Sequence, residues 1–97
     1  MGVFDWDEAN RSHIAEHGVS TSEVEFVVLH DPLDLEVQLR EGEERFVQVG
    51  ATGQSRVLVV ISTVRGELVR VVTAFDAPRR YRVAFERWRE ENYGAEA

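Results

Sequence analysis

The spacing of apolar residues changes at Leu33, and this change predicts where helices give way to strands. In the first helical segment before Leu33, the residues at positions 6, 10, 14 and 17 recur three or four positions apart, which is the spacing of one face of a helix. From there on, Leu33, Leu35, Val37 and Leu39 alternate with polar residues. This period of two is typical of a strand with one buried face. We therefore expect helices directly before this point and strands directly after it.

The first twenty residues predict a short strand followed by a helix. Residues 3–6 alternate in polarity, but the segment is long enough only for an edge strand. Asp5 or Asp7 is placed to cap a helix that runs to about His17. Gly18 is suited to end that helix as a C-cap.

A second short helix is expected directly afterwards. Ser20 or Ser22 is placed to cap it, and most residues from Val24 to Leu29 are apolar. Asp31-Pro32 ends the helix, because a residue before proline is driven out of the helical region. Two short helices in tandem therefore precede the strands.

The centre of the chain predicts four neighbouring strands. Their approximate ranges are 33–40, 45–50, 56–64 and 68–75, with short turns between them. Connections of two to five residues join antiparallel neighbours, so the strands should form a meander. The run from Val57 to Val64 is apolar on both faces, which places it centrally with a layer on either side.

A last helix is predicted from about Arg79 to Tyr93. Pro78 suits its first turn. Its apolar stripe consists of Tyr81, Ala84, Phe85 and Trp88. The expected fold class is α+β, with two N-terminal helices, a four-stranded antiparallel meander and a C-terminal helix in one domain spanning residues 1–97.

Composition and charge limit the function. There are 18 acidic and 11 basic residues, which gives a net charge of −7 and opposes attraction to RNA, DNA or an anionic membrane. All of these basic residues are arginine, whose planar fork suits phosphate or carboxylate. The chain has no cysteine, and its charged first residues do not resemble a signal peptide, so we expect a cytoplasmic location and no membrane association.

His13, Glu16 and His17 match the H-x-x-E-H pattern of some zinc enzymes. Such a site needs a third ligand from a second long helix, and Gly18 ends this helix at once. We therefore expect no metal site and no cofactor.

Arginines on consecutive strands are the best candidates for anion binding. Arg45, Arg56 and Arg70 lie on three neighbouring strands, and those that share a face would converge. They would then form either a phosphate-binding cleft or structural ion pairs, because an arginine on an apolar face needs a partner. The acidic residues placed to pair with them are Glu43, Glu44 and Glu67.

Several short motifs occur in a distinctive order. They are Phe4-Asp5-Trp6-Asp7, Asn10, His17-Gly18-Val19, Asp31-Pro32, Glu44-Arg45-Phe46-Val47 with Gly50, Leu58-Val59-Val60 and Arg70-Val71-Val72-Thr73-Ala74. Together they resemble the BrnT family, from Phe4 to about Glu86. The resemblance implies a RelE-like fold and a ribonuclease toxin of a type II toxin-antitoxin pair. The implied partner is a BrnA-like antitoxin, a ribbon-helix-helix protein that also binds operator DNA.

The resemblance also implies roles for individual residues in a metal-independent endoribonuclease. His17 would act as acid or base, since imidazole titrates near neutral pH. Arg45 and Arg70 would bind the phosphate, and Glu44 would orient one of them or act as the base. The further RNA-binding candidates are Arg56, Arg79 and Arg80.

Two positions depart from the family pattern. Glu16 stands where the family usually carries lysine, and Phe75 where it usually carries arginine. Both changes leave the apolar pattern, and hence the expected fold, intact. They favour two alternatives to the ribonuclease: a weakened or inactive module that only binds an antitoxin-like partner, or an adaptor related in fold alone. The assemblies to consider are a dimer and a toxin-antitoxin heterotetramer.

Overall fold

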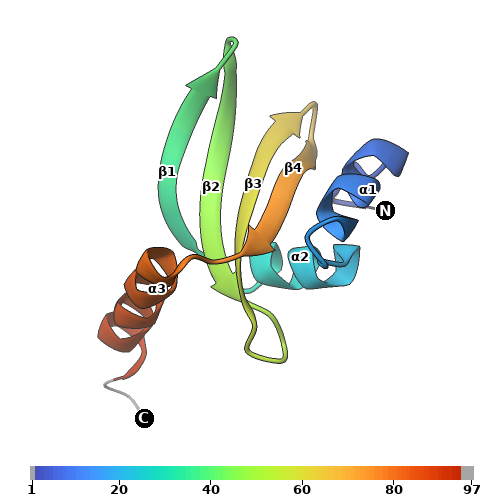
Figure 1. Ribbon diagram of the computed structural model, residues 1–97. Coiled ribbons are helices and arrows are strands. Elements are labelled where there is room, and N and C mark those ends of the chain that lie inside the picture. Colours follow the sequence, from blue (N-terminus) through green and yellow to red (C-terminus); the bar gives the residue numbers. More distant parts are fainter. Residues whose placement is uncertain (1, 95–97) are drawn as a thin grey trace.

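The computed structural model describes residues 2–94 and has the expected α+β arrangement (Figure 1). In chain order the elements are α1 (Glu8–Ala15), α2 (Thr21–Leu29), β1 (Leu33–Arg40), β2 (Glu43–Ala51), β3 (Val57–Arg65), β4 (Leu68–Asp76) and α3 (Arg79–Asn92). Among the described residues, no helix is both long enough and apolar enough to span a membrane.

Both N-terminal helices begin with a reciprocal cap. Asp7 accepts a hydrogen bond from the backbone N–H of Asn10, whose side chain accepts one from the backbone of Asp7. Ser20 and Glu23 form the same arrangement in α2. Gly18 has a φ of 70°, as expected for a residue that ends a helical turn, but α1 already ends at Ala15. His17 therefore lies outside the helix.

The four strands form one sheet in the order β1-β2-β3-β4, with antiparallel neighbours throughout. This confirms the predicted meander. The first residues of the chain run beside the outer edge of β4, with one parallel bridge between Phe4 and Val69. The backbone N–H of Asp5 donates to the Val69 carbonyl, and the N–H of Val69 donates to the carbonyl of Val3, both at 2.8 Å. The short edge strand is thus reduced to this single bridge.

Helices cover both faces of the sheet, and β3 lies in the middle as predicted. Leu58 and Val60 of β3 pack against α1 and α2, whereas Val59 packs against the layer that contains α3. The apolar stripe of α3 contacts the sheet through Tyr81, Phe85 and Trp88, as expected. Figure 1 shows α1 beside β4 and α3 at the opposite side of the sheet.

Gly50 allows α2 to approach the sheet closely. A Cβ atom at this position would lie 2.8 Å from Cγ1 of Val27, which is below any real van der Waals contact. Both residues are buried. The absence of a side chain at Gly50 therefore sets the distance between α2 and β2.

One expectation about β1 is wrong. Leu33 and Leu35 are half-buried, but Val37 and Leu39 are 58% and 71% exposed. The cause is a β-bulge after Asp34, which shifts the register by one residue and moves the later apolar side chains to the other face. No described helix covers that face at this end of the sheet.

Candidate functional site

A second bulge brings two of the predicted arginines onto one face. Between β3 and β4 the register changes after Ile61, so that Thr63 pairs with Arg70 and Val72 is the extra residue. Arg45 lies one step beyond the Phe46–Ser62 pair and so neighbours Thr63 on the other side. Arg45, Thr63 and Arg70 therefore form a row across three strands. Without the bulge, Arg70 would point to the opposite face.

This row lines a concave site of about 260 Å³, which we call the arginine pocket. Its other polar lining residues are Asn10, His13, Glu43 and Arg65. The buried Asn10 amide donates to the carbonyls of Asp5 and Val71, at 2.9 and 3.2 Å, and so fixes α1 beside β4. Because His13 follows Asn10 by almost one helical turn, the same contacts position His13 at the pocket.

Carboxylates pair with each arginine of the pocket. Glu43 lies 3.6 Å from Nε of Arg45 and 3.8 Å from Arg65. Nε of Arg45 is buried and makes no hydrogen bond with any described residue. Glu43 is thus the predicted partner for Arg45, whereas Glu44 and Glu67 form no ion pair within the described residues.

Arg70 has different partners from those expected. Its guanidinium lies 3.0 Å from the Asp7 carboxylate and 3.6 Å from that of Asp5. The pKa of Asp7 is held below its ordinary value by the N–H of Asn10 and then by Arg70. The sequence did not predict this pairing, because nothing in residues 3–7 indicates that they run beside β4. The placement of Asp5 and Asp7 two residues apart on one alternating segment is the feature that could have indicated it.

His17 and Glu44 do not line the arginine pocket. The ring of His17 lies against Phe75, with 6.0 Å between the ring centroids. The side chain of Glu44 is exposed, while its backbone carbonyl accepts a 2.8 Å hydrogen bond from the Thr63 hydroxyl. The two positions that depart from the family pattern, Glu16 and Phe75, therefore both adjoin His17.

Arg56 holds three parts of the chain together at the other end of the sheet. Its guanidinium lies 2.7 Å from Asp76 and 3.1 Å from Glu23, and it donates to the Gly18 carbonyl at 2.9 Å. The hydrogen bond from Arg56 lowers the pKa of Asp76. The pKa of Glu23 is lowered first by the Ser20 N–H and then by Arg56. These bonds match the structural ion pairs considered as an alternative for this arginine.

Arg79 and Arg80 are exposed at the start of α3, outside the arginine pocket. The guanidinium of Arg80 lies 4.5 Å from the centre of the Tyr81 ring. Neither arginine forms an ion pair with a carboxylate in the part of the chain that the structure describes.

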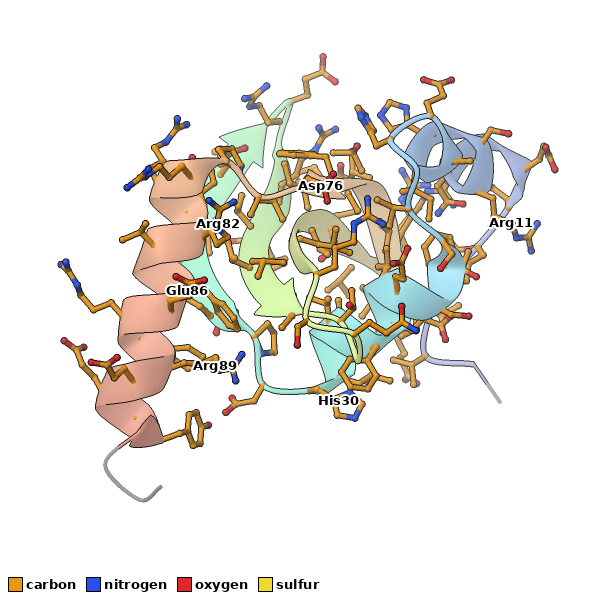
Figure 2. The ribbon with its side chains drawn as sticks, turned by 60° about the horizontal axis from the view of Figure 1, so that its bottom comes forward. Arg11, His30, Asp76, Arg82, Glu86 and Arg89 are labelled. Atoms are coloured by element: carbon orange, nitrogen blue, oxygen red, sulfur yellow. The ribbon has the colours of Figure 1, made fainter. Side chains whose placement is uncertain are left out.

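A second hollow, of about 560 Å³, lies between α2, the β2–β3 turn and α3. Its aromatic and basic lining residues are Phe26, His30, Phe85, Arg89 and Tyr93. Figure 2 shows Arg89 reaching from α3 toward the segment that carries His30. None of the predicted site residues lines this hollow. Its lining residues come from separate segments and belong to no common sequence motif, so the sequence did not indicate it.

Within residues 2–94, no three metal-ligating side chains gather into a site. His13 and His17 lie close, with 5.8 Å between their ring centroids, but only His13 lines the arginine pocket.

The geometry defines a small α+β protein whose antiparallel sheet carries paired arginines beside a histidine. A family model described as "Ribonuclease toxin, BrnT, of type II toxin-antitoxin system" matches residues 6–80. The chain belongs to this family. Its members are ribonuclease toxins, which have an RNA target and an antitoxin partner. No curated protein matches the chain.

Proposed function

We propose that this chain is a metal-independent endoribonuclease toxin that acts in the cytoplasm, binds RNA phosphate in the arginine pocket and is neutralised by a BrnA-like antitoxin. The observation that carries the proposal is the row of Arg45, Thr63 and Arg70 beside His13. The two guanidinium groups, on strands that flank the one carrying Thr63, offer converging donors to one phosphate.

RNA supplies its own nucleophile, so the protein has to bind the phosphate and to transfer protons. The 2′-oxygen attacks the neighbouring phosphorus while a base removes its proton. The bond from phosphorus to the 5′-oxygen breaks as an acid protonates that oxygen, leaving a cyclic phosphate and a free 5′-hydroxyl. Arg45 and Arg70 stabilise the charge that develops on the phosphate oxygens. His13 is the titratable group placed to transfer a proton.

Substrate must compete with carboxylates for these arginines. A phosphate that binds Arg70 takes the place of Asp5 and Asp7, and one that binds Arg45 also provides an acceptor for its unbonded Nε. Carboxylates therefore occupy both arginines until an RNA phosphate displaces them. The chain has a net charge of −7, so we expect RNA to bind only at the arginine pocket, where basic side chains are clustered.

Purified protein incubated with RNA tests the proposal directly. We expect cleavage in the presence of a chelator, and we expect induced expression to arrest growth. Arg45→Ala and Arg70→Ala should each abolish cleavage while circular dichroism remains unchanged. Arg11→Ala is the matched control, because Arg11 is exposed and points away from the sheet on α1 (Figure 2). Equal loss in the control would contradict the proposed site.

The antitoxin half of the proposal has its own test. An acidic chain gains association rate and orientation from a basic partner, so the complex with the product of the neighbouring gene should weaken as salt rises. Affinity that does not change between low and high ionic strength would remove the electrostatic argument.

A specific observation favours a second candidate, a binding module without catalysis. Phe75 occupies the space beside His17, and Glu16 adjoins it, where the family resemblance implies two basic residues. If His17 is the family's proton-transfer group, its surroundings here lack cations. The double variant Glu16→Lys/Phe75→Arg should then create cleavage that the original chain lacks. If neither form cuts RNA, the binding module is the function.

A further inference from the structure

The two edges of the sheet differ in their exposure. The N-terminal segment covers the edge of β4 through backbone hydrogen bonds to Val69. Among the described residues, β1 pairs only with β2, so the backbone groups on its outer side have no strand partner (Figure 1). Such an edge is a template for pairing with another chain unless its side chains oppose it.

Residues 36–40 of β1 form a regular strand in which polar and apolar side chains alternate. After the bulge at Asp34, residues 36–40 pair with β2 without interruption. Glu36, Gln38 and Arg40 lie on one face, and the Gln38 amide donates to Glu36 at 2.7 Å. Val37 and Leu39, which are strongly exposed, lie on the other.

This five-residue segment is complementary to itself. In an antiparallel pair centred on Gln38, Glu36 faces Arg40 of the second copy, and Val37 faces its Leu39. We propose that a second copy of this chain docks on β1 in this register, which places two ion pairs on one face and two apolar pairs on the other. The bulge ends the pairing at Glu36 and fixes its length.

The pairing has a consequence for the arginine pocket. Gln38 pairs with Arg45, so the row that contains Arg45, Thr63 and Arg70 begins at the proposed axis. In the dimer this row runs through eight strands. The two copies of Arg45 are three strand spacings apart, about 14 Å at about 4.8 Å per strand. Both arginine pockets then open on the same face.

Cysteine cross-linking tests the register. The chain has no cysteine, so Gln38→Cys introduces its only thiol, and the two-fold axis places that thiol beside its copy. Oxidation should convert most of this variant into a covalent dimer of twice 11.1 kDa. Gln54→Cys, in the exposed turn before β3, is the control and should stay mostly monomeric.

A charge exchange tests the same contacts without a covalent bond. Glu36→Arg and Arg40→Glu each place like charges opposite one another and should give monomers in sedimentation experiments. The double variant restores opposite charges and should restore the dimer. Val64→Lys is the control for a new charge on the sheet, because Val64 is 56% exposed but lies away from the edge, on the face of Val37 and Leu39.

The outcomes are distinct. Dimers that are lost in the single variants and recovered in the double variant support the proposal. An unmodified chain that stays monomeric up to about 1 mM overturns it. So does a monomeric chain whose β1 variants instead lose affinity for the antitoxin, because that result assigns the edge to the antitoxin.

Discussion

The Arg70 guanidinium lies 3.0 Å from the carboxylate of Asp7, the residue that caps α1. One side chain thus caps the start of the helix and pairs with an arginine of the pocket. The Asp7 carboxylate accepts both the Asn10 N–H and the Arg70 side chain, so a change at this position affects the cap and the pocket together. The two roles can be separated, because asparagine caps helices as well as aspartate does but carries no charge.

Asp7→Asn should therefore increase RNA binding without loss of fold. Removing the competing carboxylate from Arg70 should raise affinity for a short RNA roughly two- to fivefold, as expected for a partly exposed ion pair. Filter binding measures the change, and Asp7→Ala, which also removes the cap, is the comparison. Weaker binding by Asp7→Asn would mean that Asp7 positions Arg70 rather than competes for it.

Histidine substitutions should identify the group that transfers the proton. If His13 has this role, His13→Ala should lower the cleavage rate about 10²- to 10⁴-fold. His30→Ala is the control, because His30 stacks on Phe26 and lies outside the arginine pocket. If His17→Ala causes the loss and His13→Ala does not, the chemistry takes place beside Phe75.

Arg56→Ala should destabilise the protein by about 1 to 2 kcal/mol, because it removes a charge-assisted hydrogen bond to the partly buried Glu23 and a second one to the exposed Asp76. Arg79→Ala removes an exposed arginine without a carboxylate partner among the described residues, and it should have almost no effect. Urea unfolding measures both variants. Equal midpoints would show that solvent screens the Arg56 contacts completely.

Stability should fall in acid because Glu23 and Asp76 have lowered pKa values in the folded state. A lowered pKa stabilises the fold above the ordinary values, 4.5 for Glu23 and 3.8 for Asp76, and this contribution is lost as pH falls through the folded-state values. Urea midpoints between pH 6 and about pH 3 should decrease. Arg56→Ala should reduce that slope, and an unchanged slope would assign the acid sensitivity to other carboxylates.

Substitutions in α3 should rank by burial. Phe85 is 3% exposed, so Phe85→Ala should cost about 3 to 5 kcal/mol. Trp88 is half-buried at the same contact with the sheet, and Trp88→Ala should cost less. Thermal unfolding measures both. A larger loss for Trp88 would mean that packing at the end of α3 matters more than burial.

The order of elements was predictable because it depends on local periodicity, caps and turns. Where side chains point in β1 and β4 was not predictable, because the β1–β2 and β3–β4 pairings each contain a bulge that apolar periodicity does not reveal. The first bulge exposes Val37 and Leu39, and the second turns Arg70 toward Arg45. The motifs thus identified two arginines of the pocket.

Which of the two neighbouring histidines lines the arginine pocket was harder to predict. His13 and His17 are equivalent in the sequence pattern, but α1 ends between them. A helix end cannot be placed to within one or two residues from sequence alone, and here this difference decides which ring lines the arginine pocket. The partners of Arg70 also depended on the path of residues 3–7, which no local pattern specifies.

The way residues 3–5 are fastened beside β4 has a practical consequence for anyone producing this protein. Of the two carboxylates that neutralise Arg70, Asp5 belongs to this stretch and Asp7 follows it by two residues, so an affinity tag or fused domain joined ahead of it would crowd the pocket and alter its charge. Figure 1 shows the start of α1 and the end of α3 on opposite sides of the molecule. Purification handles, fluorophores and surface tethers therefore belong after α3, where they leave the arginines undisturbed.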